Sequence, residues 1–393
     1  MKIALVCPAS LPATQFGGIV FLAVDLAREM SELGHNVTIF TTDLDFANAS
    51  NQFNKKLPRL QKFEKFKINR THSWLSIKLF FINPGMYKQL RKENPDIIHT
   101  IGLRSFQSII AWLVSKKLKI PLVISDQGGL TTHPHLYQSG IILTALYKIQ
   151  NFFIRQIIKD SSLISVANEY EKKIFSNIDK NSKIKIIRNG VNLKSLVTTR
   201  NFKNNYEIKK KYILFVGRFS ESKGIETLIH AFHNAQQNSI MSDIILVIMG
   251  VDFGYQEKMF DLIKKLELSD KIIIVKNPPR EDVISAYSQS EFLILPSNWE
   301  LSPLVPLESF AFKKPVISSN AHGIPYTVIH NVNGILVEPE NIIELSNAIL
   351  HLVENKDKCS IFGNEGYNLV TKECNSVVMA KETLKTYEDL LYD

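Results

Sequence analysis

Short apolar runs alternate with amphipathic segments along most of this 393-residue chain, and this alternation narrows the choice of fold more than any other feature. It predicts βα units, in which each strand joins a parallel sheet and each helix covers a face of that sheet. The first series of expected strands is Ile3–Cys7, Val37–Thr41, Ile97–His99, Leu122–Ser125 and Leu163–Ala167, with helices at about 19–33, 78–93, 105–118 and 141–159. The second series is Tyr212–Val216, Ile244–Met249, Ile272–Val275, Phe292–Leu295, Val316–Ser318 and Ile335–Val337, with helices near 224–236, 256–267, 280–289, 304–312 and 341–353.

A polar stretch from Asn192 to Lys211 separates the two series and is interpreted as a linker, because it has little apolar periodicity. A chain of 393 residues exceeds what one hydrophobic core usually organises, so two domains are expected. We place an N-terminal domain at 1–195, a C-terminal domain at 196–372, and a last helix at 373–393. The predicted fold class is α/β, with two doubly wound, Rossmann-like domains facing a central cleft where ligands bind.

Composition is ordinary for a soluble globular protein. Hydrophobic residues make up 45% and charged residues 22%, and no run of about 18 apolar residues predicts a transmembrane helix. The opening MKIALVCPAS has too short an apolar stretch for a secretory signal, so it is interpreted as the first strand. The three cysteines are widely spaced and suggest neither a disulfide framework nor a zinc site.

The positive charge lies entirely in the first half. The first 190 residues contain 26 Lys and Arg against 13 Asp and Glu, whereas the rest contain 21 against 25. The charge is densest between Lys55 and Arg70, where an apolar residue recurs at every third position from Leu57 to Phe66, close to a helical stripe. This segment is either a solvated surface or a surface for anionic lipid head groups or an anionic acceptor. No recognisable nucleic-acid-binding module accompanies it, so nucleic acid is not an expected partner.

One group of charged residues follows the first strand of the second series, in FVGRFSESKG from Phe215 to Gly224. Gly217 permits a tight turn, and Arg218 and Lys223 then lie five residues apart, before a predicted helix. Two cations on one loop can neutralise a diphosphate and stabilise the negative charge of a departing one. Taken alone, two such cations are more often solvated loop residues.

A second group follows a later strand, in PSNWELSPLVPLESFAFKKPVIS from Pro296 to Ser318. Glu300 precedes a predicted helix and Glu308 falls within it. A carboxylate can accept two hydrogen bonds from vicinal hydroxyls, such as those of ribose or a hexose. Backbone amides at the helix start suit phosphate or sugar oxygens, although Pro303 lacks one. Two glutamates at this spacing are also a common coincidence.

The two groups together resemble the retaining glycosyltransferases of family 4 ("glycosyl transferases group 1"), which have the GT-B fold. They give the order GR-x4-KG and then E-x7-E followed by KPVI. Other segments are similar to family motifs: IIRNGVN (Ile186–Asn192) to PNGVD, AHGIPYTV (Ala321–Val328) to GGIPEVV, and NGILVEP (Asn333–Pro339) to NGLLVPP. The resemblance covers most of the chain and is strongest from Tyr212 to Pro339. It also implies that the helix at 373–393 crosses back to the first domain, as such tails commonly do in this fold.

The resemblance implies a role for each matching residue. Arg218 and Lys223 would bind the donor diphosphate, and Glu308 would hold the ribose hydroxyls of the nucleoside. Glu300 would contact the transferred sugar as a catalytic residue. The donor sugar pocket would also contain Leu301, Ser302, Pro303 and Leu304. The backbone of the pair Gly17 and Gly18 would approach the diphosphate from the other domain, although an ordinary glycine turn is the alternative.

The sequence departs from the family pattern at two places. Leu301–Ser302 stands where the family usually has Gly-Phe or a similar pair, so the identity of the sugar stays open. Many members have a histidine after the fourth strand, whereas this chain reads ISDQGG, with Asp126 at that place. Asp126 is the first candidate for a contact with a sugar or acceptor hydroxyl, and His133, in the following loop, is the second. A simple turn residue and a solvated histidine are the alternatives.

The tripeptide Asp43-Leu44-Asp45 has the form of a metal-binding D-x-D. It follows the second strand of the domain that lacks the donor motifs, and such tripeptides are common by chance. We expect no metal there and no metal or other cofactor for the reaction, since Arg218 and Lys223 would neutralise the leaving group.

The resemblance implies transfer of a sugar from a UDP- or GDP-sugar to a hydroxyl of a glycan or lipid-linked acceptor, with retention, in cell-envelope polysaccharide or glycolipid synthesis. The expected location is the cytoplasm or, as a peripheral protein, the inner face of the membrane. A sugar-nucleotide epimerase of the same architecture and a non-catalytic sugar-nucleotide-binding protein are the alternatives. The E-x7-E pattern favours transfer over epimerisation.

Overall fold

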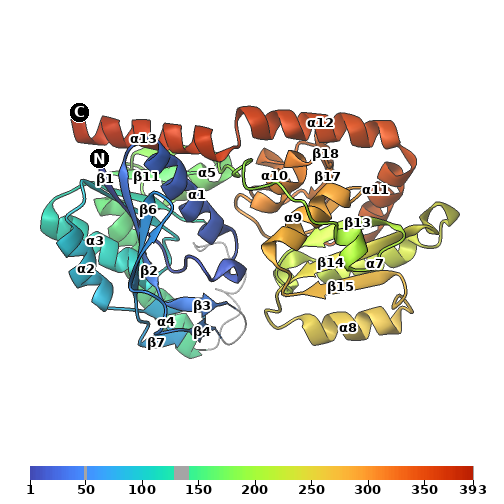
Figure 1. Cartoon of the computed structure of the whole chain (residues 1–393), viewed down its shortest axis with the longest axis horizontal. Coiled ribbons are helices and arrows are strands. Elements are labelled where there is room, and N and C mark those ends of the chain that lie inside the picture. The colour runs from blue at the N-terminus through green and yellow to red at the C-terminus, as the bar shows by residue number, and fades with distance from the viewer. Residues whose placement is uncertain (48–50, 128–140, 393) are drawn as a thin grey trace. The chain divides into compact units, whose positions relative to one another are not determined.

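The computed structural model of the chain describes residues 1–47, 51–127 and 141–392. It divides into two compact units (Figure 1): unit 1 comprises Met1–Asn189 and Ser376–Asp393, and unit 2 comprises Gly190–Asn375. Each unit is described by itself.

Unit 1 is built on an eight-stranded sheet. Its strands are β1 (Lys2–Val6), β2 (Asn36–Thr42), β5 (Leu60–Phe63), β6 (Phe66–Thr71), β9 (Ile97–Ile101), β10 (Leu122–Ser125), β11 (Leu163–Val166) and β12 (Ile184–Ile186). They lie in the order β12-β11-β10-β9-β1-β2-β6-β5, and all neighbours run parallel except β5, which is antiparallel to β6. Two small hairpins lie outside this sheet: β3 (Leu44–Phe46) with β4 (Gln52–Phe53), and β7 (Leu75–Ile77) with β8 (Phe80–Ile82).

The helices of unit 1 are α1 (Gly18–Glu32), α2 (Gly85–Glu93), α3 (Phe106–Leu118), α4 (Ile141–Asp160), α5 (Glu169–Ile178) and α13 (Ser376–Tyr392), preceded by the 3-10 turn η1 (Thr14–Phe16). Alternate strand residues such as Ala4 and Val6 pack with α2, α3 and α4 in one buried cluster. The helix α13 packs against α1.

Buried polar contacts attach α13 to the rest of unit 1. The Tyr387 hydroxyl and His99 Nδ1 are 2.6 Å apart, and the Ser376 hydroxyl donates to the Glu29 carboxylate at 2.8 Å. Buried polar groups are costly unless they are hydrogen-bonded, so these contacts favour one seating of α13.

Unit 2 contains a six-stranded parallel sheet. Its strands are β13 (Lys211–Val216), β14 (Ile244–Gly250), β15 (Ile272–Lys276), β16 (Leu293–Leu295), β17 (Val316–Ser319) and β18 (Gly334–Val337). Their order, β15-β14-β13-β16-β17-β18, is the Rossmann order. The order reverses between β13 and β16, so ligands are expected beyond the carboxyl ends of these two strands.

Helices cover both faces of the second sheet. They are α6 (Phe202–Asn205), α7 (Ile225–Ala235), α8 (Gln256–Lys265), α9 (Arg280–Gln289), α10 (Leu304–Ala311), α11 (Ile342–Glu354) and α12 (Lys356–Lys372), with the 3-10 turns η3 (Glu221–Lys223), η4 (Ser239–Met241) and η5 (Ile324–Tyr326). Phe215 packs with residues of α7, α8 and α11 in one buried cluster, and its neighbour Leu214 packs with residues of α9 and α10 in another. Successive strand residues thus serve opposite faces, as doubly wound sheets require.

The basic segment from 55 to 70 forms the antiparallel hairpin β5–β6, so the expected helical stripe is wrong. Phe66, Ile68 and Arg70 are all buried, and a spacing of two residues is the period of a strand. The guanidinium of Arg70 donates to two backbone carbonyl oxygens, at 3.0 and 2.8 Å. Part of the charge expected on the surface is therefore inside the fold.

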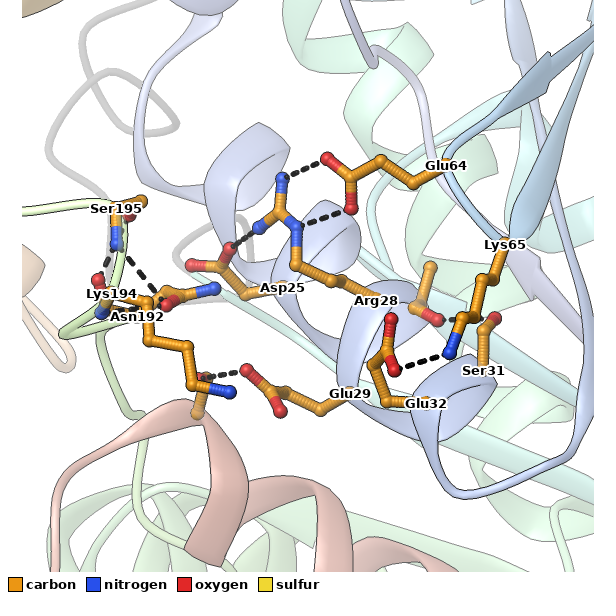
Figure 2. Close-up of polar contacts among 12 residues, drawn as sticks. Asp25, Arg28, Glu29, Ser31, Glu32, Glu64, Lys65, Asn192, Lys194 and Ser195 are labelled. Carbon is orange, nitrogen blue, oxygen red and sulfur yellow. Dashed lines mark hydrogen bonds and ion pairs between the residues drawn. The ribbon is translucent and has the colours of Figure 1, made fainter.

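Further charge of this hairpin is paired with α1 (Figure 2). Lys65 donates to Glu32 at 2.6 Å, and Glu64 accepts from the Arg28 guanidinium at 2.7 and 3.1 Å. Arg28 also donates to Asp25, at 2.5 Å. The exposed Lys65–Glu32 pair contributes little stability, but these contacts together show that the hairpin and α1 share a charged surface.

The helix expected at 78–93 begins only at Gly85. The preceding residues form the hairpin β7–β8, with Lys78 at its turn in a left-handed conformation, φ 54°. Leu75, Ile77 and Leu79 alternate with polar residues as strand residues do, and the apolar run continues to Ile82. The predicted helix was wrongly extended back to residue 78.

The polar stretch from Asn192 to Lys211 is not an exposed linker. Leu196, Phe202 and Ile208 are buried in unit 2, and the short helix α6 lies against α9. The few apolar residues of this stretch are enough to hold it onto the domain.

Candidate functional site

The loop that follows β13 lies at the reversal point of the second sheet. Arg218 is half-buried, with its guanidinium 5.1 Å from the ring centre of Phe253. Burial lowers the pKa of Arg218, whereas the charge of Glu300 raises it. An arginine stays protonated even so, and this loop therefore presents a fixed positive charge.

The loop that follows β16 is fastened to the first loop. The Asn298 N–H donates to the Ser222 carbonyl oxygen at 2.9 Å. Gly224 has a left-handed φ of 65°, and a Cβ there would lie 2.0 Å from the Pro296 carbonyl oxygen. A side chain at this position would force the loops apart, so glycine is required for their close approach.

Glu300, on the second loop, forms an ion pair with Lys223 of the first. Each side chain is 14% exposed. Two cations and one carboxylate, those of Arg218, Lys223 and Glu300, are thus gathered at the edge of the sheet. This charge pattern suits a ligand that carries both phosphate and hydroxyl groups.

The residues after Glu300 lead into α10. Leu301 is buried, Ser302 is half-buried, Pro303 is the N-cap and Leu304 is the first helical residue. The N-terminus of a helix favours anions and oxygen ligands, although at eight residues α10 is short.

Glu308, inside α10, is held by a residue that the motif did not reveal. Its side chain is 6% exposed and accepts a forked pair of hydrogen bonds from Arg280, at 2.5 and 3.1 Å. Burial raises the pKa of the nearby Tyr287 phenol, and the charge of Glu308 raises it further. A carboxylate has about four lone-pair positions, so Glu308 can accept from Arg280 and from ligand hydroxyls together.

In unit 1, Gly17 is the N-cap of α1 and Gly18 is its first residue. Gly17 has a left-handed φ of 103°, and a Cβ there would meet no described atom within 4 Å. The backbone conformation, rather than lack of space, calls for glycine at this position.

Asp126 directly follows β10 and is buried. Burial raises the pKa of Glu171, at the start of α5, to about 8, and the charge of Asp126 adds to this effect. Gln127, beside Asp126, helps to line a small hollow between the sheet, α1 and α13. His133 lies outside the described residues.

His99 is a structural residue of unit 1. It is buried, its Nε2 lies 3.2 Å from the Ser125 hydroxyl, and its Nδ1 is bonded to Tyr387. Burial lowers the pKa of His99 to about 3, so the ring is neutral near pH 7.

The D-x-D aspartates serve local structure. Asp43 accepts from the His72 ring at 2.6 Å and from the Ser73 N–H at 3.0 Å, and Asp45 accepts from the Asn54 amide at 2.9 Å. Among the described residues, no group of three or more His, Cys, Asp or Glu side chains could hold a metal ion.

Two family models match the chain and together cover most of it. "Glycosyltransferase Family 4" matches residues 16–195, and "Glycosyl transferases group 1" matches residues 198–369. An uncharacterized glycosyltransferase of Methanocaldococcus jannaschii is 26% identical over 99% of both chains. The UDP-Gal:α-D-GlcNAc-diphosphoundecaprenol α-1,3-galactosyltransferase of Escherichia coli is 24% identical over 75% of this chain and 73% of its own.

Solved structures share the whole fold. The sucrose-phosphate synthase of Thermosynechococcus elongatus superimposes with a TM-score of 0.78 at 18% identity, covering 99% of each chain. HepE of Anabaena, in complex with UDP-glucose, gives a TM-score of 0.75 at 16% identity, covering 99% of this chain and 100% of its own.

Proposed function

Because the chain belongs to the family 4 glycosyltransferases and has the GT-B fold, we propose that it transfers a sugar from a nucleoside diphosphate sugar to an acceptor hydroxyl with retention of configuration. Membership of this family makes it a glycosyltransferase rather than an epimerase or a non-catalytic binding protein. The observation that carries the donor assignment is the meeting of Arg218, Lys223 and Glu300 at the reversal point of the second sheet.

The donor diphosphate would lie against the two cations. Lys223 has three N–H donors, so it can keep its bond to Glu300 while donating to a phosphate oxygen. As the glycosidic bond breaks, negative charge grows on the departing diphosphate, and fixed cations stabilise that state without rearranging. This supports a reaction that needs no metal or other cofactor.

Glu300 would accept from hydroxyls of the transferred sugar, next to the pocket formed by Leu301, Ser302, Pro303 and Leu304. Glu308, oriented by Arg280, would accept from the ribose hydroxyls. The acceptor hydroxyl would attack from the face that the diphosphate leaves and give its proton to a phosphate oxygen. In this scheme the protein acts chiefly by positioning and electrostatics.

Unit 1 would supply the acceptor side of the reaction. We assign Gly17 and Gly18 to a close approach of backbone to the diphosphate, and Asp126 and His133 to contacts with sugar or acceptor hydroxyls. Asp126 directly follows β10, at the carboxyl end of a parallel strand where ligands bind in such sheets, and this position supports its assignment.

The acceptor is proposed to be a glycan or a lipid-linked glycan of the cell envelope, with a UDP- or GDP-sugar as donor. The E. coli relative is named for a UDP-sugar and a diphosphoundecaprenol acceptor, and HepE was solved with UDP-glucose. No helix among the described residues has the length and apolarity to cross a membrane. We propose that the enzyme works in the cytoplasm, at the inner face of the membrane.

A thermal-shift screen against UDP-, GDP- and ADP-sugars tests the donor assignment, because a ligand that binds only the folded state raises its stability. We expect one nucleotide to raise the melting temperature, and Glu308→Ala to lose most of that rise. The matched control is Glu344→Ala, an exposed glutamate of α11. A full rise in the Glu308 variant would remove Glu308 from the donor site.

A further inference from the structure

An exposed apolar surface with a basic border lies on unit 1. Two elements contribute to it, the hairpin β7–β8 and the helix α4. We define the hairpin–α4 surface by its exposed apolar residues, which are Trp74, Leu75, Leu79, Ile149 and Phe152.

The hairpin presents its large side chains to solvent. Trp74, which precedes β7, is 73% exposed, and Leu75 and Leu79 are also exposed. Its inner side is anchored, since Phe80 packs edge-on against Phe106 with ring centres 6.2 Å apart. The exposed residues are therefore held outward on a fixed hairpin.

The helix α4 continues this surface. Phe152 is 60% exposed and Ile149 is exposed, whereas Ile154 and Ile157 on the opposite side are buried. Phe80 of the hairpin, together with residues of α4 such as Gln150 and Phe153, lines one small cavity, so the two elements are neighbours (Figure 1).

Basic residues predominate on the two elements of this surface. Residues 74–82 and the helix α4 contain Lys78, Lys148, Arg155 and Lys159, against one acidic residue, Asp160, which pairs with Lys116 of α3 at 2.9 Å. Lys78 is at the hairpin turn, and Lys148 and Arg155 lie on the exposed face of α4. None of these three has an acidic partner among the described residues.

We propose that the hairpin–α4 surface docks on an anionic lipid bilayer. Tryptophan prefers the boundary between head groups and acyl chains, and long basic side chains bind lipid phosphates beside it. Charge complementarity favours a bilayer over a second copy of this chain, because two copies would bring like charges together. The inference rests on the proposed function, since a lipid-linked acceptor requires the enzyme at the membrane.

Vesicle co-sedimentation of the whole protein tests the proposal. We expect binding to vesicles that contain phosphatidylglycerol and little binding to pure phosphatidylcholine. High salt should weaken it, because the Debye length falls from about 10 Å at 0.1 M to about 3 Å at 1 M. Trp74→Ser and Phe152→Ser should each lower the partition coefficient about tenfold, as expected when a large apolar side chain loses its insertion.

Matched substitutions elsewhere serve as controls. Ile343→Ser removes an apolar residue of α11 that is 69% exposed, and Lys264→Glu reverses an exposed charge on α8. We expect both to leave vesicle binding within about twofold of wild type, whereas Lys148→Glu lowers it several-fold, since each basic residue near the surface contributes about 1 kcal/mol. Unfolding midpoints of all variants report whether the fold is intact.

Three results would overturn the proposal. They are wild-type protein that ignores anionic vesicles, equal losses in the control and surface variants, and a dimer that Trp74→Ser dissociates without any lipid affinity. The sugar-nucleotide thermal shift, measured on the same samples, separates the two claims. Intact donor binding without vesicle binding refutes the docking surface alone, and vesicle binding without donor binding refutes the proposed function alone.

Discussion

Replacing Arg280 by methionine is expected to weaken donor binding more than it slows transfer. Arg280 donates to both oxygens of Glu308, at 2.5 and 3.1 Å, and so fixes the plane of this carboxylate. Methionine keeps part of the apolar side chain of Arg280 and removes both of its hydrogen bonds to Glu308. If Glu308 holds the ribose, its hydrogen bonds are made equally before and during the reaction, so their loss raises KM and leaves kcat nearly unchanged.

The magnitude follows from the geometry. A hydrogen bond to a charged group contributes about 1.5–3 kcal/mol, and a misoriented carboxylate forfeits roughly one such bond, which corresponds to a rise in KM of about 10- to 100-fold. Breaking a fully buried ion pair costs about 3–5 kcal/mol, but Arg280 is 29% exposed, so the expected loss of unfolding free energy is nearer 2 kcal/mol.

Steady-state kinetics with varied donor and a denaturant titration measure the two quantities. Arg200→Met is the matched control, because Arg200 pairs with Glu281 and Asp282 on the same helix α9. It should cost stability without changing KM. The double variant Arg280→Met with Glu308→Gln should lose less unfolding free energy than the two single variants lose together. A KM within twofold of wild type in Arg280→Met, or strictly additive losses in the double variant, would refute the reasoning.

Three further outcomes are expected. Burial raises the pKa of Glu171 from 4.5 to about 8, so the folded chain keeps a proton that the unfolded chain loses, and stability falls as pH rises across this interval. Glu171→Gln keeps an oxygen that accepts from the Ala167 N–H, so its unfolding free energy should exceed that of wild type by about 1–3 kcal/mol at pH 8 and equal it at pH 4.5. Thermal unfolding at the two pH values measures this, and a difference independent of pH contradicts it. Tyr387→Phe removes the bond to His99 and should lower the unfolding free energy by about 1 kcal/mol with KM for the donor unchanged; a changed KM would show that α13 affects the donor site. Transfer should persist in EDTA, whereas Lys223→Met lowers kcat; activity that EDTA abolishes and Mg²⁺ restores would refute the metal-free reaction.

The sequence predicts all six strands of the second sheet and five of the eight strands of the first, because these strands are largely continuous apolar runs. The strand β14, Ile244–Gly250, is buried at every residue, and such runs are read directly from the sequence. The helix α12, by contrast, was not expected. It contains Gly363 and Gly366, which weaken a helical pattern, and their reason is tertiary: a Cβ would lie 2.0 Å from the Lys313 carbonyl oxygen and 2.2 Å from the Phe310 ring.

At the candidate site, the sequence motifs identify the residues proposed to contact the donor, such as Glu308. They do not identify Arg280, which orients Glu308. Arg280 stands 28 positions before Glu308, at the start of another helix, and nothing in its local sequence distinguishes it from a solvated arginine. The hairpins β5–β6 and β7–β8 were missed for a related reason. Their apolar residues fit both a helical and a strand period over such short lengths, and only contacts with the rest of the unit decide between them.

The packing of α13 against α1 affects the order in which unit 1 can fold during synthesis. Unit 1 is assembled from two stretches of chain, with all of unit 2 between them. During synthesis α13 leaves the ribosome after unit 2. Until then, Leu22 and Leu26 of α1 lack Met379 and Thr383 of α13, which line the same hollow in the complete fold. We expect residues 190–375 to fold when produced alone and residues 1–189 to aggregate unless α13 is supplied. The half of the enzyme that is synthesised first is thus completed last.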